Sequence, residues 1–175
     1  MLRIVLTGSP GTGKSSAAKI LAKKLGAQAV NDLDFCKKNR IGVFDRKAKE
    51  RVVPVERLER ALKKFLAKKP AKAPVKNAES VILEGHLLCE ISIPCDAVVV
   101  LRLAPKALEK RLAKRGYPEV KVLDNVFCEE TGYCWTRALR NYSGNKIIEA
   151  DSSASARETA KKILQSLEGL GVDLS

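Results

Sequence analysis

Five short apolar runs occur along the chain of 175 residues, and each is followed by residues with a different periodicity. SVILEG and DAVVVLRL, the third and fourth runs, are almost continuously apolar. Such runs are typical of parallel β-strands that are covered on both faces. The runs predict strands at residues 2–8, 27–30, 80–85, 96–103 and 145–151.

Between these runs, apolar residues recur at the spacing of amphipathic helices. Residues 15–25, for example, place their apolar side chains on one face and their lysines on the other. Asn31 or Asp32 is expected to cap the second helix, and Thr131-Gly132 interrupts the fifth. The pattern predicts helices over residues 15–25, 31–38, 54–66, 105–115, 118–140 and 155–167.

Strands that alternate with helices over the whole length predict an α/β protein with a parallel sheet. A chain of 19.1 kDa has the size of one domain, which we expect to span residues 1–175. Two stretches lack a clear period. Residues 39–53 are expected to form an irregular, solvated excursion, and residues 68–79, rich in Pro, Ala and Lys, a basic connector.

The first strand leads into GSPGTGKSS, where Gly8, Gly13, Lys14 and Ser15 match the pattern GxxxxGK[ST]. A strand before and a helix after are the context that this phosphate-binding loop requires. Glycines let the backbone approach a phosphate, and the N–H groups at a helix start bind anions. Lys14 is expected to reach the β and γ phosphates of ATP, and Ser15 to offer its hydroxyl to Mg²⁺.

Chain length and missing motifs narrow the class of P-loop protein. A GTPase would need a guanine-specifying NKxD segment, and the sequence contains none. Larger ATPases need more residues than this chain has. A short kinase with five strands remains.

Two further groups of residues are candidates for the chemistry. Glu84 ends the third strand, where open α/β sheets bind their ligands, so it is a candidate to hold a Mg²⁺-bound water or to orient the acceptor. His86 follows and is the only histidine, with a structural role as the alternative. Arg111 and Arg115 lie four residues apart on one helix. Arg115 is the stronger candidate to stabilise a phosphoryl group, with a solvated cationic helix end as the alternative.

The net charge of +13 is concentrated in one segment. Residues 37–76 contain 15 basic and 4 acidic residues, a balance of +11, whereas the rest of the chain sums to +2. Such a segment fits an anionic partner such as RNA, or serves solubility alone. No apolar run approaches the ~20 residues that cross a bilayer. We expect a cytoplasmic protein with reduced thiols and no membrane partner. Nuclear residence stays open because KKPAKAPVK is similar to import signals.

Taken together, LTGSPGTGKSS, VILEGH, LEKRLAKRGY and KVLDNVFCE resemble one family over most of the chain. This is the adenylate kinase-like family of archaea and the eukaryotic nucleus, which includes the coilin-interacting nuclear adenylate kinase type. The run RGYxxxKxxxNxxxE, from Arg115 to Glu129, is the most specific part of the resemblance.

The resemblance implies a three-layer P-loop fold with sheet order 2-3-1-4-5, a monophosphate-binding region about residues 31–53 and a short lid about residues 114–124. It implies Mg-ATP and AMP as substrates, ATPase activity, and a role in maturing the small ribosomal subunit with a small-subunit ribosomal protein and rRNA. The family's acid position falls on Glu84 and its following histidine on His86. Its ATP-binding positions fall on Gly11, Gly13, Lys14, Ser15, Ser16 and Arg115.

The sequence departs from the family in the monophosphate-binding region, which is typically acidic. Here VFDRKAKERVVPVE begins with Asp45 and Glu50 set among basic residues instead of an acidic cluster. The acceptor therefore stays open, and two alternatives remain: an assembly ATPase that binds RNA or a ribosomal protein, and a kinase of another small acceptor, shikimate-like or nucleoside. Trp135 also departs from the family, and we expect it to pack in the core rather than to stack on a base.

Overall fold

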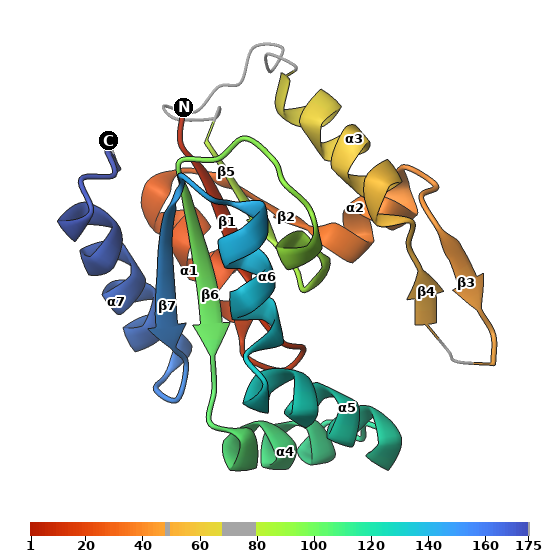
Figure 1. Ribbon diagram of the computed structural model, residues 1–175. Coiled ribbons are helices and arrows are strands. Elements are labelled where there is room, and N and C mark those ends of the chain that lie inside the picture. Colours follow the sequence, from red (N-terminus) through yellow and green to blue (C-terminus); the bar gives the residue numbers. More distant parts are fainter. Residues whose placement is uncertain (48–49, 68–79, 175) are drawn as a thin grey trace.

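In the computed structural model, which describes residues 1–47, 50–67 and 80–174, a five-stranded sheet forms the centre of the molecule (Figure 1). Its strands pair in parallel in the order β2-β5-β1-β6-β7. With the separate hairpin of β3 (Val43–Asp45) and β4 (Glu50–Val52) left aside, this is the order 2-3-1-4-5, and the predicted α/β P-loop fold is confirmed. The strands are β1 (Arg3–Thr7), β2 (Gln28–Asn31), β5 (Val81–Glu84), β6 (Ala97–Arg102) and β7 (Lys146–Asp151).

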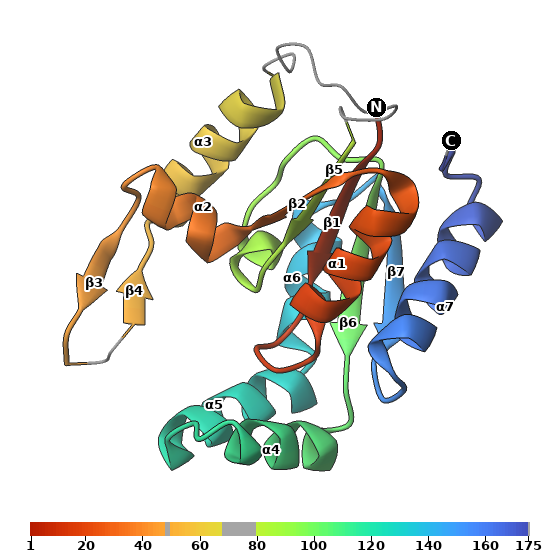
Figure 2. The ribbon, with the colours of Figure 1, turned by 180° about the vertical axis from the view of Figure 1, so that it is seen from behind.

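Helices cover both faces of this sheet. On one face lie α1 (Lys14–Leu25) and α7 (Ala156–Gly169), which Figure 2 shows in front of the strands. On the other face lie α2 (Asp32–Lys38), α3 (Val55–Ala67), α6 (Tyr133–Asn141) and the short 3-10 helix η1 (Leu87–Glu90). Beyond the end of β6, α4 (Pro105–Lys114) and α5 (Glu119–Glu130) pack on each other through a small apolar cluster.

The apolar strands divide their side chains between two cores because successive residues of a strand point to opposite faces. Ile4 and Leu6 of β1 pack with α1 and α7, and Val5 packs with α3 and α6. All three are fully buried. Trp135 of α6 packs, partly buried, against the second of these cores, as expected.

The start of α2 and the break between α5 and α6 agree with the sequence. Asn31 is the N-cap of α2, and its side chain accepts a hydrogen bond from the N–H of Asp34 at 3.0 Å. Gly132, with a left-handed φ of 62°, separates α5 from α6. Among the described residues, no helix combines the length and apolarity needed to span a bilayer.

The prediction that residues 39–53 lack regular structure is wrong. This stretch contains an antiparallel hairpin of β3 (Val43–Asp45) and β4 (Glu50–Val52). Its strands have only three residues each and are largely exposed, so burial imposes no alternation that the sequence could show. The connector predicted at residues 68–79 lies outside the described residues.

Candidate active site

The loop between β1 and α1 has the geometry of a phosphate cradle. Gly8, Gly11 and Gly13 all have positive φ angles, of 137°, 94° and 98°, which other residues rarely adopt. A Cβ atom on Gly8 would lie 2.3 Å from the carbonyl oxygen of Leu101. Among the described residues, the N–H groups of Gly11, Gly13, Lys14 and Ser15 donate to no protein acceptor. Such donors at a helix start are what an anionic phosphate requires.

Lys14 lies within this loop rather than pointing into solvent. Its side chain is buried, and Nζ donates to the carbonyl oxygens of Gly8 at 2.9 Å and Ser9 at 3.0 Å. Burial lowers the pKa of Lys14, while the nearby carboxylates of Asp32 and Glu84 act to raise it. The loop thus holds the Lys14 amine at the place where the phosphates of a nucleotide would add negative charge, which favours the charged form of the amine.

Glu84 connects α1 to the end of β2. Its Oε1 accepts hydrogen bonds from the Ser15 hydroxyl at 2.9 Å and from the Asn31 amide at 2.7 Å. The carboxylate is buried, with 5% of the residue exposed. The structure therefore brings Ser15 and Glu84 together, as the sequence suggested, and adds Asn31, which sequence reasoning treated only as a helix cap.

The Ser15–Glu84 pair fits a magnesium ion in its chemistry. Mg²⁺ prefers hard oxygen ligands, uses only one or two of them from the protein, and keeps several waters besides phosphate oxygens. A hydroxyl and a carboxylate at the edge of a phosphate cradle are such a set. Ser15 would hold the ion directly and Glu84 through a water.

Asp32, expected only as a possible helix cap, is a buried carboxylate at this site. It is 2% exposed, and its two oxygens accept hydrogen bonds from the N–H groups of Leu33 at 2.6 Å and Leu87 at 2.9 Å. Burial raises its pKa to about 6, although both N–H groups and Lys14 act to lower it. His86, partly buried, directly precedes Leu87. Burial and then the charge of Lys14 lower the pKa of His86 to about 4, so its ring is neutral at pH 7.

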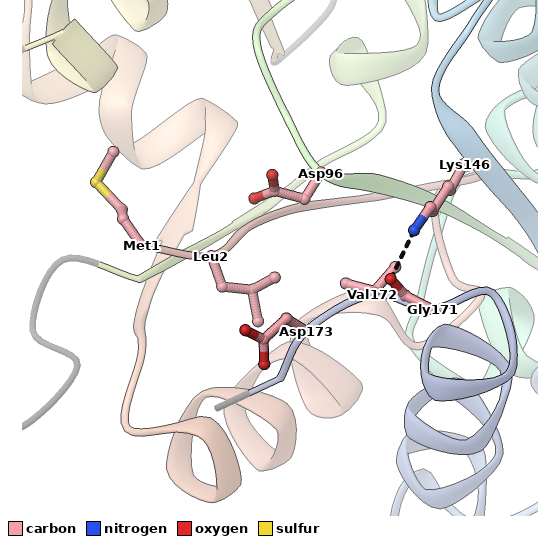
Figure 3. Close-up of a pocket in the computed structure, with 7 residues that line it drawn as sticks. All are labelled: Met1, Leu2, Asp96, Lys146, Gly171, Val172 and Asp173. Carbon is pink, nitrogen blue, oxygen red and sulfur yellow. Dashed lines mark hydrogen bonds between the residues drawn. The ribbon is translucent and has the colours of Figure 1, made fainter.

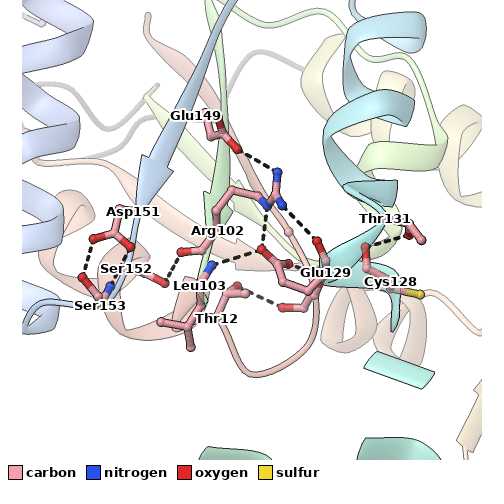
Figure 4. A network of polar contacts seen from close by, with 12 residues as sticks. Thr12, Arg102, Leu103, Cys128, Glu129, Thr131, Glu149, Asp151, Ser152 and Ser153 are labelled. Carbon is pink, nitrogen blue, oxygen red and sulfur yellow. Dashed lines mark hydrogen bonds and ion pairs between the residues drawn. The ribbon is translucent and has the colours of Figure 1, made fainter. Parts of the chain in front are cut away.

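A buried carboxylate also ties the phosphate-binding loop to α5. Glu129, 2% exposed, accepts a hydrogen bond from the Ser9 hydroxyl at 2.6 Å through Oε2. Its Oε1 accepts from Arg102 Nε at 2.6 Å and from the N–H of Leu103 at 3.0 Å (Figure 4). Arg102 also binds Glu149 at 2.7 Å. The sequence placed Glu129 in a family motif without giving it a role.

The two candidate arginines of α4 lie in different surroundings. Arg111 reaches back over the loop, and its Nη1 donates to the Gly11 carbonyl at 3.3 Å. Arg115, the residue preferred from the sequence, is the exposed C-cap of α4 and has no side-chain partner among the described residues. Ser16 is exposed in the first turn of α1. The part of the predicted lid between α4 and α5 includes Gly116, with a φ of 71°.

A cavity of about 590 Å³ opens beside Ser15 and Glu84. Its walls come from α1, β2, α2 and α3, and include Phe35 and Phe65, whose rings pack edge to face with centroids 5.5 Å apart. Lys19 and Lys38 add two cations to the lining. Aromatic side chains together with a few polar and charged groups are typical of a site for a small molecule.

A second cavity, of about 340 Å³, lies at the opposite end of the sheet (Figure 3). Leu2, Asp96 and Lys146, which line it, stand at or just before the amino ends of strands. Lys146 Nζ donates to the Gly171 carbonyl at 2.7 Å, so this cation holds the chain after α7. The cavity is remote from the phosphate-binding loop.

An ion pair links the hairpin to α5. Lys121 Nζ lies 2.9 Å from Glu50 Oε2. Glu50 belongs to the predicted monophosphate-binding region, and Lys121 to the predicted lid. The two segments that the resemblance names are therefore in contact in this structure.

These features define the chain as a P-loop kinase. Solved structures agree on the fold: a gluconokinase from Sinorhizobium meliloti aligns with a TM-score of 0.64 over 97% of this chain and 93% of its own, at 16% identity. A shikimate kinase from Aquifex aeolicus aligns with a TM-score of 0.58 over 98% of this chain and 99% of its own, at 19% identity.

Residues 4–132 match the AAA_18 family, described as an AAA domain, and the chain belongs to this family. A protein of Pyrococcus furiosus is 33% identical over 97% of this chain and 85% of its own length. A protein of Methanosarcina mazei is 37% identical over 94% of this chain and 84% of its own length. Both carry the name "Putative adenylate kinase".

Proposed function

We propose that this chain is an adenylate kinase-type phosphotransferase that converts Mg-ATP and AMP into two ADP. The observation that carries the proposal is the Ser15–Glu84 hydrogen bond, which joins the phosphate-binding loop to a cavity large enough for an acceptor. The names of the curated relatives support a nucleoside monophosphate as that acceptor.

In this mechanism the loop amides and Lys14 hold the terminal phosphates, and no covalent enzyme intermediate is needed. Bound Mg²⁺ would neutralise phosphate charge. Glu84, held by Asn31, orients groups beside the transferring phosphoryl group, and neutral His86 offers a hydrogen bond near the acceptor. Arg115 reaches the phosphates when the lid between α4 and α5 closes. Positioning and charge neutralisation supply the rate.

Steady-state assays of the Lys14→Ala variant test this proposal. ADP formation from ATP and AMP is expected to disappear while circular dichroism shows an intact fold. The control is Lys161→Ala on α7, which is expected to retain wild-type turnover. Lys19→Ala is less suitable because Lys19 lines the cavity. Undiminished ADP formation by Lys14→Ala would contradict the assignment. A screen of acceptors at constant ATP, with an ATP-only reaction, decides between AMP, a shikimate-like or nucleoside acceptor, and simple hydrolysis.

A second candidate function is an assembly ATPase that acts on pre-ribosomal RNA or on a small-subunit ribosomal protein. It is favoured by the exposed cations of α3, which include Arg57, Arg60 and Lys64 on the surface opposite the buried Leu58 and Leu62. RNA binding through this face should weaken steeply with salt, because each phosphate contact releases counterions. Binding that is absent, or that does not depend on salt, would remove this candidate.

A further inference from the structure

Asn31, the last residue of β2, and Asp32, the first residue of α2, contact the chain at and just after the end of β5. Asn31 Nδ2 donates to Glu84 at 2.7 Å, and Asp32 Oδ2 accepts from the N–H of Leu87 at 2.9 Å. Glu84 precedes Gly85 and His86, and Leu87 follows them. The dipeptide Asn31-Asp32 therefore contacts both ends of the stretch from Glu84 to Leu87, which carries two of the candidate side chains, Glu84 and His86.

Gly85 shows how closely this stretch is fitted to Asp32. A Cβ atom at Gly85 would lie 1.8 Å from Asp32 Cγ and 1.9 Å from its Oδ2. A real Cβ atom cannot approach that closely, so the backbone at Gly85 rests directly against the carboxylate. The requirement for glycine here is steric, since φ at Gly85 is not among the positive values.

We infer that Asn31 and Asp32 are positioning residues for the active site: Asn31 fixes the Glu84 carboxylate, and Asp32 fixes the backbone turn that carries His86. Asp32 does not need to touch the substrate. Asp32 is 2% exposed and both of its oxygens are already engaged by N–H groups, so it acts through the turn. The expected effect on turnover rests on the proposed function, whereas the effect on the place of His86 does not.

A carboxylate at the start of α2 also favours the helix by itself, because it lies near the positive end of the helix dipole. A role confined to helix stability would lower the unfolding temperature without changing the surroundings of His86. Glu158 offers a matched control. It is a carboxylate in the first turn of α7, hydrogen-bonded to Ser155 in a capping box, and α7 covers the face of the sheet opposite to α2.

The experiment compares Asp32→Ala, Asp32→Asn and Glu158→Ala with the wild-type protein. Because His86 is the only histidine, its ring gives a single ¹³Cε1–¹H signal in an NMR spectrum recorded without nucleotide at pH 7.5. We expect this signal to move toward the position of a free histidine in both Asp32 variants and to stay in place in Glu158→Ala. We also expect kcat for ADP formation to fall about tenfold to a hundredfold while KM for ATP changes less than about threefold.

The outcomes separate the two levels of the inference. A shifted His86 signal with unchanged kcat confirms that Asp32 positions His86 and contradicts the catalytic role proposed for His86. An unchanged His86 signal in folded Asp32→Asn overturns the inference whatever the activity. Asparagine keeps the size of aspartate, so this variant remains informative if Asp32→Ala does not fold.

Asn31→Asp tests the role proposed for Asn31, which is to fix the Glu84 carboxylate. Aspartate caps a helix about as well as asparagine, so α2 should keep its start, but the donor to Glu84 is replaced by a second carboxylate. If the amide of Asn31 fixes Glu84, we expect kcat to fall about tenfold in Asn31→Asp. Serine also caps a helix and has a hydroxyl donor, so kcat of Asn31→Ser should lie between those of Asn31→Asp and the wild type. Wild-type kcat in Asn31→Asp contradicts a positioning role for Asn31.

Discussion

Ser9 and Glu129 are 120 positions apart in the sequence, yet the hydroxyl of Ser9 donates to the buried carboxylate of Glu129 at 2.6 Å. The same carboxylate accepts hydrogen bonds from Arg102 Nε and from the N–H of Leu103, both at the end of β6. The phosphate-binding loop, the sheet and the last turn of α5 thus meet at one side chain.

Removal of this carboxylate should weaken both fold and nucleotide binding. Glu129→Ala leaves the guanidinium of Arg102 and the Leu103 N–H without their partner, so we expect the free energy of unfolding to fall by about 3 kcal/mol. KM for ATP should rise about tenfold because Ser9 is released. Urea unfolding and initial rates measure the two effects. Glu149→Gln, which removes the half-exposed partner of Arg102, should cost less than about 1 kcal/mol. Equal losses in the two variants would contradict this account.

The stability of the protein should depend on pH through two groups with opposite signs. The pKa of Asp32 is raised to about 6, so the folded state holds its proton more tightly than the unfolded state. The stability that the protonated form contributes is present below about pH 4 and is lost as pH rises through 6. The pKa of His86 is lowered to about 4, so its contribution is present above about pH 6.5 and is lost as pH falls through 4.

These two effects partly cancel in the wild-type protein, and variants separate them. Relative to Asp32→Asn, the wild type should lose up to about 3 kcal/mol of stability between pH 4 and pH 7. Relative to His86→Gln, it should gain a similar amount over the same range. Chemical unfolding at a series of pH values gives both differences. Parallel curves for all three proteins would show that neither group titrates abnormally in the fold.

Gly85→Ala should be strongly destabilising because its new Cβ atom would overlap Asp32. Overpacking of this kind costs about 1–3 kcal/mol. In an Asp32→Ala background the carboxylate is absent, so the same substitution should cost clearly less. A double-mutant cycle of unfolding free energies measures this coupling. Additive effects would mean that the clash is relieved without moving Asp32.

The ion pair between Lys121 and Glu50 should matter little for stability. Both side chains are partly exposed, and such pairs contribute at most about 1 kcal/mol. Lys121→Gln should therefore unfold almost as the wild type does, but KM for AMP should rise a few-fold if the hairpin helps to hold the acceptor. Lys63→Gln, which breaks a pair within α3, serves as the control. Equal KM values for the two variants would contradict that role for the hairpin.

Arg111 and Arg115 should have different kinetic effects. Arg111→Ala removes a contact to the Gly11 carbonyl, and we expect weaker ATP binding in calorimetry. Arg115 has no side-chain partner among the described residues, so Arg115→Ala should leave stability unchanged and lower kcat about a hundredfold if its charge meets the phosphoryl group on lid closure. A wild-type kcat in Arg115→Ala would contradict this role for Arg115 and would indicate that Arg111 stabilises the phosphoryl group instead.

The sequence predicted the parallel sheet and its helices because buried strands and amphipathic helices leave periodic patterns. It also predicted the phosphate-binding loop, because Gly8 and Gly13 have backbone φ angles that residues other than glycine rarely adopt. It did not predict the hairpin, since three-residue exposed strands such as Val43–Asp45 leave no pattern.

The roles of Asn31, Asp32 and Glu129 depend on contacts between segments that are distant in sequence, which no local pattern records. A signal was nevertheless present for the first two. Asn31 ends a strand and Asp32 follows it, at the carboxyl edge of a parallel sheet where side chains from neighbouring strands converge.

Trp135 gives the molecule an internal fluorophore. It is the only tryptophan, it is partly buried against the core, and its helix α6 packs on η1, the 3-10 turn that follows His86. Its emission would therefore report, without any attached dye, whether filling the phosphate cradle displaces the end of β5, and a stopped-flow trace would time that displacement against product release.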